Sequence, residues 1–386
     1  MTVLVRRATV AISLVSLAVL TGCPDKKPVE PPKPVAVSTP AKPPPPPEKP
    51  RALKECAAPL EAAPAVDVKI GDRDAKLAGA KLAFTAKDTD GALVLGVLGP
   101  INEDSGENMV NLKKYVKFFK DEKADAIVVT GDIGEKASSI TRVLKTLAES
   151  KLPVLVVIGN RECRAEFTDG VDGARKESSS VVNLNEVREV DFPELTILSL
   201  PGYHDPEFIN CATGCRYLES TVDEVVSAAK GSSAPVLLVS HGPPHGEGNL
   251  ALDYASAGGN VGDPQINRAI AEGNISFGVF SNIKEAGGRA ASDAAGTVLV
   301  KEGTAAKALY LAAGPADTIG WEMNDGQKSV GMAHVMSIKE GQATWKSMRA
   351  KALTAAEKAE AKKLEPPPEP KEAPAPPPGQ PAPKAP

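Results

Sequence analysis

The chain has 386 residues, of which 42% are hydrophobic and 24% charged, and its formal net charge is −4 at pH 7. This small net charge gives no indication of nucleic-acid binding, which usually appears as a strongly basic surface. Between two proline-rich ends, residues 53–352 are numerous enough for one large domain with a substantial core.

The N-terminus has the pattern of an export signal. An Arg-Arg pair at 6–7 precedes an apolar stretch, 8–20, that is shorter than the about 20 residues of a membrane-spanning helix. The following "LTGC" resembles the bacterial lipobox, in which the cysteine is lipidated and becomes the first residue. We therefore expect a signal peptide at 1–22, lipidation of Cys23 and attachment to a membrane of the cell envelope, on the periplasmic or the surface side. An ordinary cleaved signal with an incidental Cys23 is the alternative.

Proline-rich segments flank the domain. The first follows Cys23 within 23–52, and its prolines alternate with Lys, Glu and Ala, so it cannot pack a core. We expect a solvated spacer, roughly 80 Å long if fully extended. In the C-terminal part, 353–386, the stretch 354–364 indicates a solvated helix and a proline-rich tail follows. Docking to a proline-binding partner is the alternative role for these segments.

Within the domain, short apolar runs rich in Val, Ile and Leu alternate with helical patterns. The expected strands are 92–98, 126–129, 154–158, 195–200, 236–239 and 275–280. The expected helices are 108–119, 138–149, 221–229 and 264–271. This order predicts an α/β fold whose strands are buried on both faces.

Four cysteines remain in the domain, and export favours their pairing as disulfides. They are Cys56, Cys163, Cys211 and Cys215. We expect at least one disulfide, and three pairings of the four are open. A metal site at Cys211 and Cys215 is the rival interpretation, although their spacing is not that of a zinc ribbon.

Unusual residues follow the predicted strands directly. They are Pro100 to Asn102, Gly131-Asp132, Gly159-Asn160, Ser240-His241-Gly242 and Ser281 to Lys284. The carboxyl ends of the strands in a layered α/β sheet line one crevice, where binding sites form. We therefore expect these residues to lie close together.

The order of the motifs resembles the calcineurin-like metallophosphoesterases over residues 90–345. The motifs are "TGDIGE", then "IGNRE", then "VSHGPP", then a turn ending in "EAGGRA". The resemblance implies a layered β-sandwich flanked by helices, with two metal ions bridged by an aspartate. Family ligands usually come from D-x-H, G-D-x-x, G-N-H-E, a histidine before glycine, and G-H-x-H.

Three ligand positions match the family. Asp132 corresponds to the bridging aspartate, Asn160 to the asparagine ligand and His241 to the lone histidine, while Asn282 could add an amide oxygen. Divalent ions favour several anionic or imidazole ligands. The resemblance therefore implies one divalent ion at most, bound at micromolar affinity or more weakly, or none.

The remaining positions depart from the family. Pro100 and Asn102 stand in place of D-x-H, and Lys284 stands at the second histidine of G-H-x-H. We expect the Lys284 ammonium to form a salt bridge with Asp132, which would otherwise be an unpaired carboxylate. Arg161 stands at the general-acid histidine, and its planar fork suits a phosphate or another anion.

The histidines divide by position. His241 is expected to face the crevice, and a hydrogen-bonded core histidine is the alternative. His245 is expected at a loop rim and His334 within a strand. His204, in "GYHDPE", is a candidate substitute acid or ligand.

Two functions follow from these patterns. One is an active phosphoesterase with a single metal ion, in which His204 or Asp104 takes over a missing role. The other is a non-catalytic lipoprotein that uses the fold for binding or envelope interaction. The missing ligands favour reduced or lost catalysis, because one weakly held ion cannot replace the pair that activates water and clamps both oxygens. No feature identifies a substrate or a protein partner.

Overall fold

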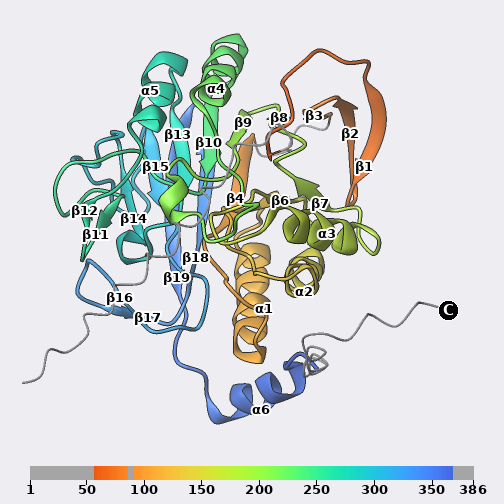
Figure 1. Ribbon diagram of the computed structural model, residues 1–386, viewed down its shortest axis with the longest axis vertical. Helices are drawn as coiled ribbons and strands as arrows, with labels where there is room; N and C mark the ends of the chain where they lie inside the picture. Colours follow the sequence, from red (N-terminus) through yellow and green to blue (C-terminus); the bar gives the residue numbers. More distant parts are fainter. Residues whose placement is uncertain (1–55, 86–90, 368–386) are drawn as a thin grey trace, which may run out of the picture. The chain divides into compact units, whose positions relative to one another are not determined.

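A computed structural model describes residues 56–85 and 91–367, which lie in the second of two units of the chain, Glu48–Pro386 (Figure 1). The predicted signal peptide, Cys23, the first proline-rich segment and nearly all of the second lie outside the described residues. No helix among the described residues is both long enough and apolar enough to cross a membrane.

The described strands form two main sheets. A nine-stranded sheet runs in the order β1 (Val66–Ile70), β2 (Arg73–Ala78), β3 (Lys81–Phe84), β8 (Glu189–Phe192), β9 (Leu195–Leu200), β10 (Val236–Ser240), β13 (Phe277–Phe280), β15 (Leu309–Ala312) and β14 (Arg289–Ala291). A six-stranded sheet runs in the order β19 (Gln342–Arg349), β18 (Met332–Lys339), β4 (Ala92–Leu98), β5 (Ala126–Val129), β6 (Val154–Val156) and β7 (Val181–Asn183). Two short hairpins, β11 (Tyr254–Ala255) with β12 (Gly259–Asn260) and β16 (Trp321–Glu322) with β17 (Lys328–Ser329), lie in connecting segments.

Helices cover the outer face of each sheet, which gives four layers. The six-stranded sheet packs against α1 (Gly106–Asp121), α2 (Ala137–Ala148) and α3 (Arg164–Arg175). The nine-stranded sheet packs against α4 (Glu219–Gly231) and α5 (Pro264–Gly273). A central core, drawn from both sheets, fills the space between them. The expected α/β fold, a β-sandwich flanked by helices, is therefore confirmed.

The apolar runs predicted the central strands closely. The runs at 92–98, 126–129 and 195–200 coincide with β4, β5 and β9. Successive side chains of a strand point to opposite faces, so a strand covered on both faces is apolar at nearly every position. The remaining predicted strands and helices are found within a few residues of their expected ends. The antiparallel strands β1 to β3, the strands β7, β8, β14, β15 and β19, and the helix α3 were not expected.

The helix predicted at 354–364 exists and most of its residues are exposed, as expected, but one side of it contacts the domain. α6 (Ala355–Leu364) begins at a capping box between Thr354 and Glu357 and packs against α1. Ala361 is 2% exposed, and a Cβ on Gly106 of α1 would lie 2.0 Å from the carbonyl oxygen of Ala361. One small buried residue in a charged sequence was too weak a signal to predict this contact.

Both disulfides join residues that are far apart in the sequence. Cys56 pairs with Cys215 and Cys163 pairs with Cys211. The expectation of at least one disulfide is confirmed. The rival metal site at Cys211 and Cys215 is wrong, because both sulfurs are bonded elsewhere.

His334 lies in β18, as predicted. Its Nε2 donates to the Ala313 carbonyl at 2.7 Å, and its Nδ1 accepts from the Ser347 hydroxyl at 2.8 Å. Burial lowers the pKa of His334 to about 4, so the ring is neutral at pH 7. It is a hydrogen-bonded core histidine.

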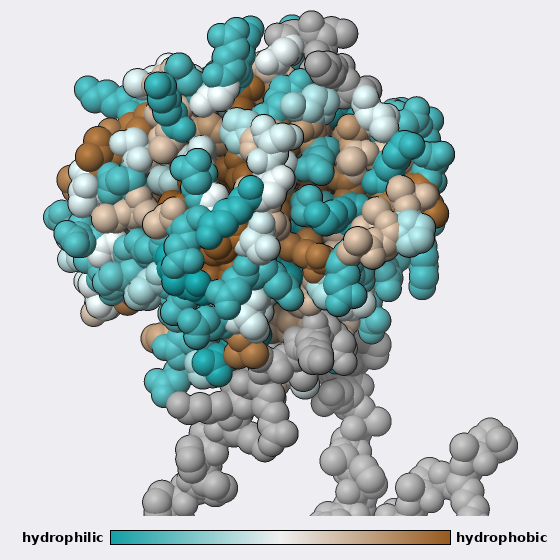
Figure 2. All heavy atoms as spheres, turned by 90° about the horizontal axis from the view of Figure 1, so that it is seen from above, coloured by the Kyte–Doolittle hydropathy of each residue, from teal (hydrophilic) through white to brown (hydrophobic). Residues whose placement is uncertain are grey.

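Few large apolar side chains are exposed among the described residues. Figure 2 shows this for one face, where hydrophilic residues predominate. The exposed large apolar residues of the described chain are Val66, Phe208, Leu218, Leu250, Val298, Leu299 and Ile319. Scattered exposure of this kind is ordinary for a folded domain and does not by itself mark an interface.

Candidate functional site

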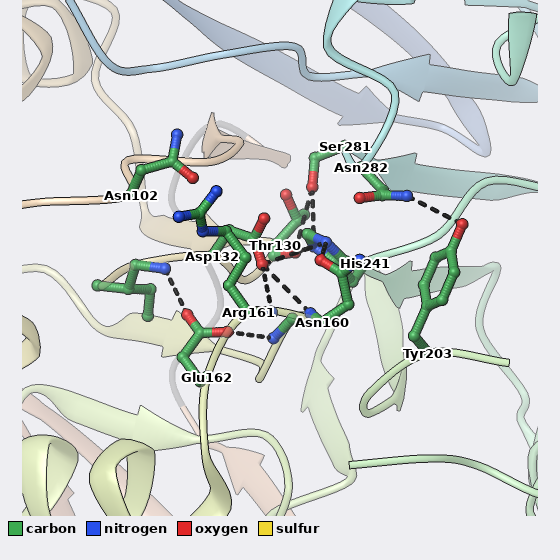
Figure 3. Close-up of polar contacts among 12 residues, drawn as sticks. Asn102, Thr130, Asp132, Asn160, Arg161, Glu162, Tyr203, His241, Ser281 and Asn282 are labelled. Atoms are coloured by element: carbon green, nitrogen blue, oxygen red, sulfur yellow. Dashed lines mark hydrogen bonds and ion pairs between the residues drawn. The ribbon is translucent and has the colours of Figure 1, made fainter. Parts of the chain in front are cut away.

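Strand ends from the two sheets meet at one place. Asp132 and Asn160 follow the neighbouring parallel strands β5 and β6, whereas His241 and Asn282 follow the neighbouring parallel strands β10 and β13. Figure 3 shows Asp132, Asn160 and His241 pointing toward one another, with Asn282 beside them. The motifs therefore do lie together, but Asp132, Asn160 and His241 are buried at 1%, 8% and 0% exposure, so His241 is a hydrogen-bonded core histidine and does not face an open crevice as expected.

Two glycines permit this close approach. A Cβ on Gly159 would lie 2.3 Å from Asp132 Oδ1, and a Cβ on Gly131 would lie 2.6 Å from the Gly159 Cα. Gly131 also has a φ of +96°, which disfavours other residues, and Asp132 itself adopts a φ of +54°. The glycine before each polar residue in "GD" and "GN" is thus a packing requirement of the site.

Backbone N–H groups, and not Lys284, support the Asp132 carboxylate. Asp132 is 1% exposed, and its Oδ1 accepts from the backbone N–H groups of Asn160 at 3.2 Å and Arg161 at 3.1 Å. The Lys284 Nζ instead lies 5.0 Å from the centre of the Trp321 ring. Among the described residues no ion pair joins Lys284 to Asp132, so the expected salt bridge is wrong. Sequence spacing placed Lys284 at the strand end but could not give its side-chain direction.

The His241 ring is held in one tautomer. It is completely buried, and its Nδ1 lies 2.7 Å from the carbonyl oxygen of Thr130. A carbonyl oxygen only accepts, so Nδ1 carries the hydrogen and donates. In the neutral ring, Nε2 then presents a lone pair to the opposite side.

That lone pair faces two oxygen acceptors. Nε2 of His241 lies 3.1 Å from Asn160 Oδ1 and 3.4 Å from Asp132 Oδ1. Asn160 is oriented by its Nδ2, which donates to the Phe208 carbonyl at 2.7 Å. Three acceptor atoms therefore converge, and they need either a proton on Nε2 or a cation between them.

The spacing of these atoms suits one small metal ion. Two ligand atoms that each lie about 2.1 Å from an ion are about 3.0 Å apart at a right angle and about 3.4 Å apart at a tetrahedral angle. The two His241 Nε2 distances, 3.1 and 3.4 Å, fall in this range. Asp132, Asn160 and His241 therefore fit a single ion of this size, although the set has only one negative charge.

The Asn282 side chain lies next to this group and forms its hydrogen bond with another residue, Tyr203. Its backbone N–H donates to the His241 carbonyl at 2.9 Å, and its Nδ2 donates to the Tyr203 hydroxyl at 2.9 Å. Tyr203 packs against Gly242, where a Cβ would lie 2.8 Å from the tyrosine ring. The glycine after His241 therefore makes room for the ring that contacts Asn282.

The residues present do not fit a second ion. Pro100 has no side-chain donor atom, and Asn102 donates its Nδ2 to Asp317. Asn102 Oδ1 is buried without a hydrogen-bond partner among the described residues, and Figure 3 shows Asn102 apart from the His241 group. Burial raises the pKa of Asp317, whereas Trp321, Asn102 and Lys284 lower it. The positions that would supply the second ion's ligands are thus taken by the Asn102 amide, which is bound to the Asp317 carboxylate, and by Lys284, whose ammonium lies over the Trp321 ring.

Arg161 follows Asn160 directly, and its side chain reaches the surface. Its guanidinium forms an ion pair with Glu135, and these side chains are 36% and 58% exposed. Burial lowers the pKa of Arg161, but the carboxylates Glu135, Asp132 and Glu162 raise it by more, so the net shift is upward. The planar fork that was expected to suit an anion is therefore occupied by a surface carboxylate.

His204 lies apart from the three converging residues. Its ring is tilted by 41° against the Tyr203 ring, with centres 4.6 Å apart, and lines a cavity of about 140 Å³ together with Arg216 and Asp263. Burial lowers the pKa of His204, whereas Asp263 and Asp205 raise it. No described contact joins His204 to Asp132, Asn160 or His241.

The other candidates occupy structural positions. The Asp104 carboxylate forms an ion pair with the Arg142 guanidinium at 2.6 Å and accepts from the Ser139 hydroxyl at 2.9 Å. The half-exposed His245 lies in a loop, with its Nδ1 3.6 Å from Oδ2 of the buried Asp253.

Glu162 is completely buried beneath the site. Its carboxyl oxygens accept from the backbone N–H groups of Ile133 and Gly159, so it joins the two strand-end loops. Burial and the nearby Asp132 raise the pKa of Glu162, against the lowering effect of these N–H donors. Glu162 therefore has a structural role in joining these two loops.

The comparisons agree with the motif order. The family model of the calcineurin-like phosphoesterases matches residues 104–274. No curated protein matches the chain. Within the described residues, no group of three or more His, Cys, Asp or Glu side chains could hold a metal ion.

Similar solved structures include three from distant organisms. A dimetal phosphatase from Danio rerio is 13% identical, with 67% of this chain and 96% of that chain covered and a TM-score of 0.41. GAP50, the anchor in the inner membrane complex of Plasmodium, is 10% identical, with coverages of 74% and 99% and a TM-score of 0.43. A protein of Thermus thermophilus is 14% identical, with coverages of 58% and 90% and a TM-score of 0.42.

Proposed function

We propose that this chain, whose residues 104–274 match the family model of the calcineurin-like phosphoesterases, is an envelope-anchored lipoprotein in which phosphoester hydrolysis is reduced or lost. Its domain holds one weakly bound divalent ion at most. It acts chiefly as a binding or envelope-interaction module that uses the phosphoesterase fold.

One observation carries the proposal. The strand-end positions of the second ion are filled by Pro100, by Asn102 bound to Asp317, and by Lys284 stacked on Trp321. Two-metal hydrolysis needs ions that activate water and stabilise both the attacking and the leaving oxygen. A single ion held by Asp132, Asn160 and His241 could polarise a phosphoryl oxygen but could not form that clamp.

Arg161 favours an anion as the ligand of such a module. Its guanidinium forms a surface ion pair with Glu135, and exposed pairs of this kind contribute about 0–1 kcal/mol. A phosphate or carboxylate group can therefore take the place of Glu135 at small cost. The guanidinium fork suits both groups.

An active enzyme with one ion and a substitute acid is the second candidate function, and the geometry does not favour it. His204 lies in its own cavity, and Asp104 is engaged by Arg142 and Ser139. Neither side chain has a described contact with the residues around His241.

The purified domain is expected to bind no more than one divalent ion when dialysed against micromolar Mn²⁺ or Zn²⁺. It should hydrolyse an aryl phosphate no faster than the Asp132→Asn variant, because the second set of ligands is missing. Elemental analysis and a colorimetric assay measure these quantities. Two bound ions, with turnover abolished by Asp132→Asn, would restore a two-metal enzyme and end the proposal.

For the anchor, Cys23→Ser should leave an unlipidated precursor or a soluble product, because the cysteine thiol is the acylation point. Partition between detergent and aqueous phases, together with the mass of the N-terminal peptide, tests this. A variant that still enters the detergent phase after signal removal would contradict lipidation at Cys23.

A further inference from the structure

One loop contacts the site from the side of the nine-stranded sheet. Residues 202–217, here called the orienting loop, connect β9 to α4. The loop is fastened at two places, by the disulfides Cys163–Cys211 and Cys56–Cys215. It is therefore tied covalently to the segment that follows Asn160.

The orienting loop binds Asn160 through both its side chain and its backbone. The Phe208 carbonyl accepts from Asn160 Nδ2 at 2.7 Å, and the Asn210 N–H donates to the Asn160 carbonyl at 2.8 Å. Cys163 follows Asn160 by three residues, and Cys211 follows Phe208 by three residues. The disulfide thus closes a short clamp around the amide.

This contact decides which end of the amide faces His241. A backbone carbonyl only accepts, so the Phe208 oxygen requires Nδ2 beside it and turns Oδ1 toward His241 Nε2. A flipped amide would instead donate its Nδ2 hydrogen to the Nε2 lone pair. In the metal-free protein, a hydrogen bond from Nδ2 to Nε2 would be more favourable than the present contact between two acceptor atoms. It would also occupy the Nε2 lone pair, which could then no longer bind an ion.

We propose that the Cys163–Cys211 disulfide is a positioning device that holds Phe208 against Asn160 and keeps the amide oxygen turned toward the ion position. This inference rests on the proposed function, in which Asn160 is one of the ligands of a single ion. Without the disulfide the loop can withdraw, the amide can flip, and the cation loses a ligand. Groups that orient ligands in this way commonly change metal affinity by about 10- to 100-fold.

The test uses Co²⁺, whose binding is followed by calorimetry and whose visible spectrum reports its ligands. Cys163→Ser with Cys211→Ser should weaken Co²⁺ binding at least about 10-fold and alter the spectrum. The matched control is the same pair of substitutions in an Asn160→Asp background. A carboxylate presents an oxygen in either orientation, so removing the disulfide there should leave affinity unchanged within about twofold. Unchanged affinity in the Asn160 background, or an equal loss in both, would overturn the proposal.

A second measurement needs neither a variant nor a metal. In the metal-free parent, the side-chain amide hydrogens of Asn160 should exchange slowly with solvent and keep the chemical shift of a donor to a carbonyl. The ¹⁵N signal is assigned by its absence in Asn160→Asp. Fast exchange, or a shift showing donation to His241, would refute the role of the loop. If the parent binds no Co²⁺ but this amide is held as described, the single-ion function fails while the orienting contact stands.

Discussion

Replacing Cys56 and Cys215 by serine is expected to lower the free energy of unfolding by about 5 kcal/mol. The disulfide joins residues 159 positions apart, and closing so long a loop restricts the unfolded chain strongly. Both cysteines are buried, at 2% and 0% exposure, so the serine hydroxyls also enter an apolar cluster. The loss is a large part of the about 5–15 kcal/mol that stabilises a typical domain.

Denaturant unfolding under oxidising conditions, followed by circular dichroism, measures this loss. Cys163→Ser with Cys211→Ser is the matched comparison, since its loop of 48 positions predicts a loss of about 4 kcal/mol. A change smaller than about 1 kcal/mol for the first pair would mean that Cys56 is already held by other contacts. Such contacts exist nearby, because the Ala58 N–H donates to the Asn185 carbonyl at 2.8 Å and the Ala58 carbonyl accepts from Arg188 at 3.1 Å.

The central strands could be predicted from the sequence because burial on both faces leaves a continuous apolar run. β5, at Ala126–Val129, is buried at each of its positions. The edge strand β1 has no such run, since one face and one edge are exposed and its residues alternate with charged ones. The alternation of its apolar residues with Asp67 and Lys69 is the pattern of a half-buried strand, but over so short a stretch it is a weaker signal than a continuous apolar run.

The helix α3 shows how tertiary contact overrides local preference. Its sequence contains Gly170 and Gly173, which disfavour a helix. A Cβ at Gly170 would lie 2.6 Å from the Ile140 Cβ of α2, and one at Gly173 would lie 2.5 Å from the Thr141 hydroxyl. The glycines allow the two helices to approach closely, which no pattern within α3 could indicate.

For the site, the order of the motifs brought Asp132, Asn160 and His241 to one place, as the structure has them. The sequence could not give the direction of a long side chain, and so the predicted pairing of Lys284 with Asp132 was wrong. It also could not give the Thr130 and Phe208 carbonyls, because every residue has a carbonyl. These two atoms nevertheless fix the tautomer of His241 and the orientation of Asn160.

Restoring the family ligands is expected to produce a second ion site. The substitutions are Pro100→Asp, Asn102→His, Asn282→His and Lys284→His, and they add one carboxylate and three imidazoles while removing an ammonium. Position 102 has a φ of +64°, which histidine tolerates better than most residues. The Asp317 carboxylate, which now accepts from Asn102, can orient an imidazole there, as carboxylates do for metal-ligating histidines.

The variant should bind two Mn²⁺ or Zn²⁺ ions where the parent binds one at most, because the new ligands supply the charge and imidazole groups that such ions favour. Adding Arg161→His should then raise turnover of an aryl phosphate by a further factor of about 100 or more, since a proton donor to the leaving oxygen typically contributes that much. The control carries the same five substitutions together with Asp132→Asn, because Asp132→Asn removes the carboxylate that both ions would share. Metal occupancy that stays at or below one ion would mean that the strand ends around Asn102 and Asn282 have moved away from the geometry of a two-metal site. In that case the backbone of the domain, and not the side chains alone, would prevent a second ion from binding.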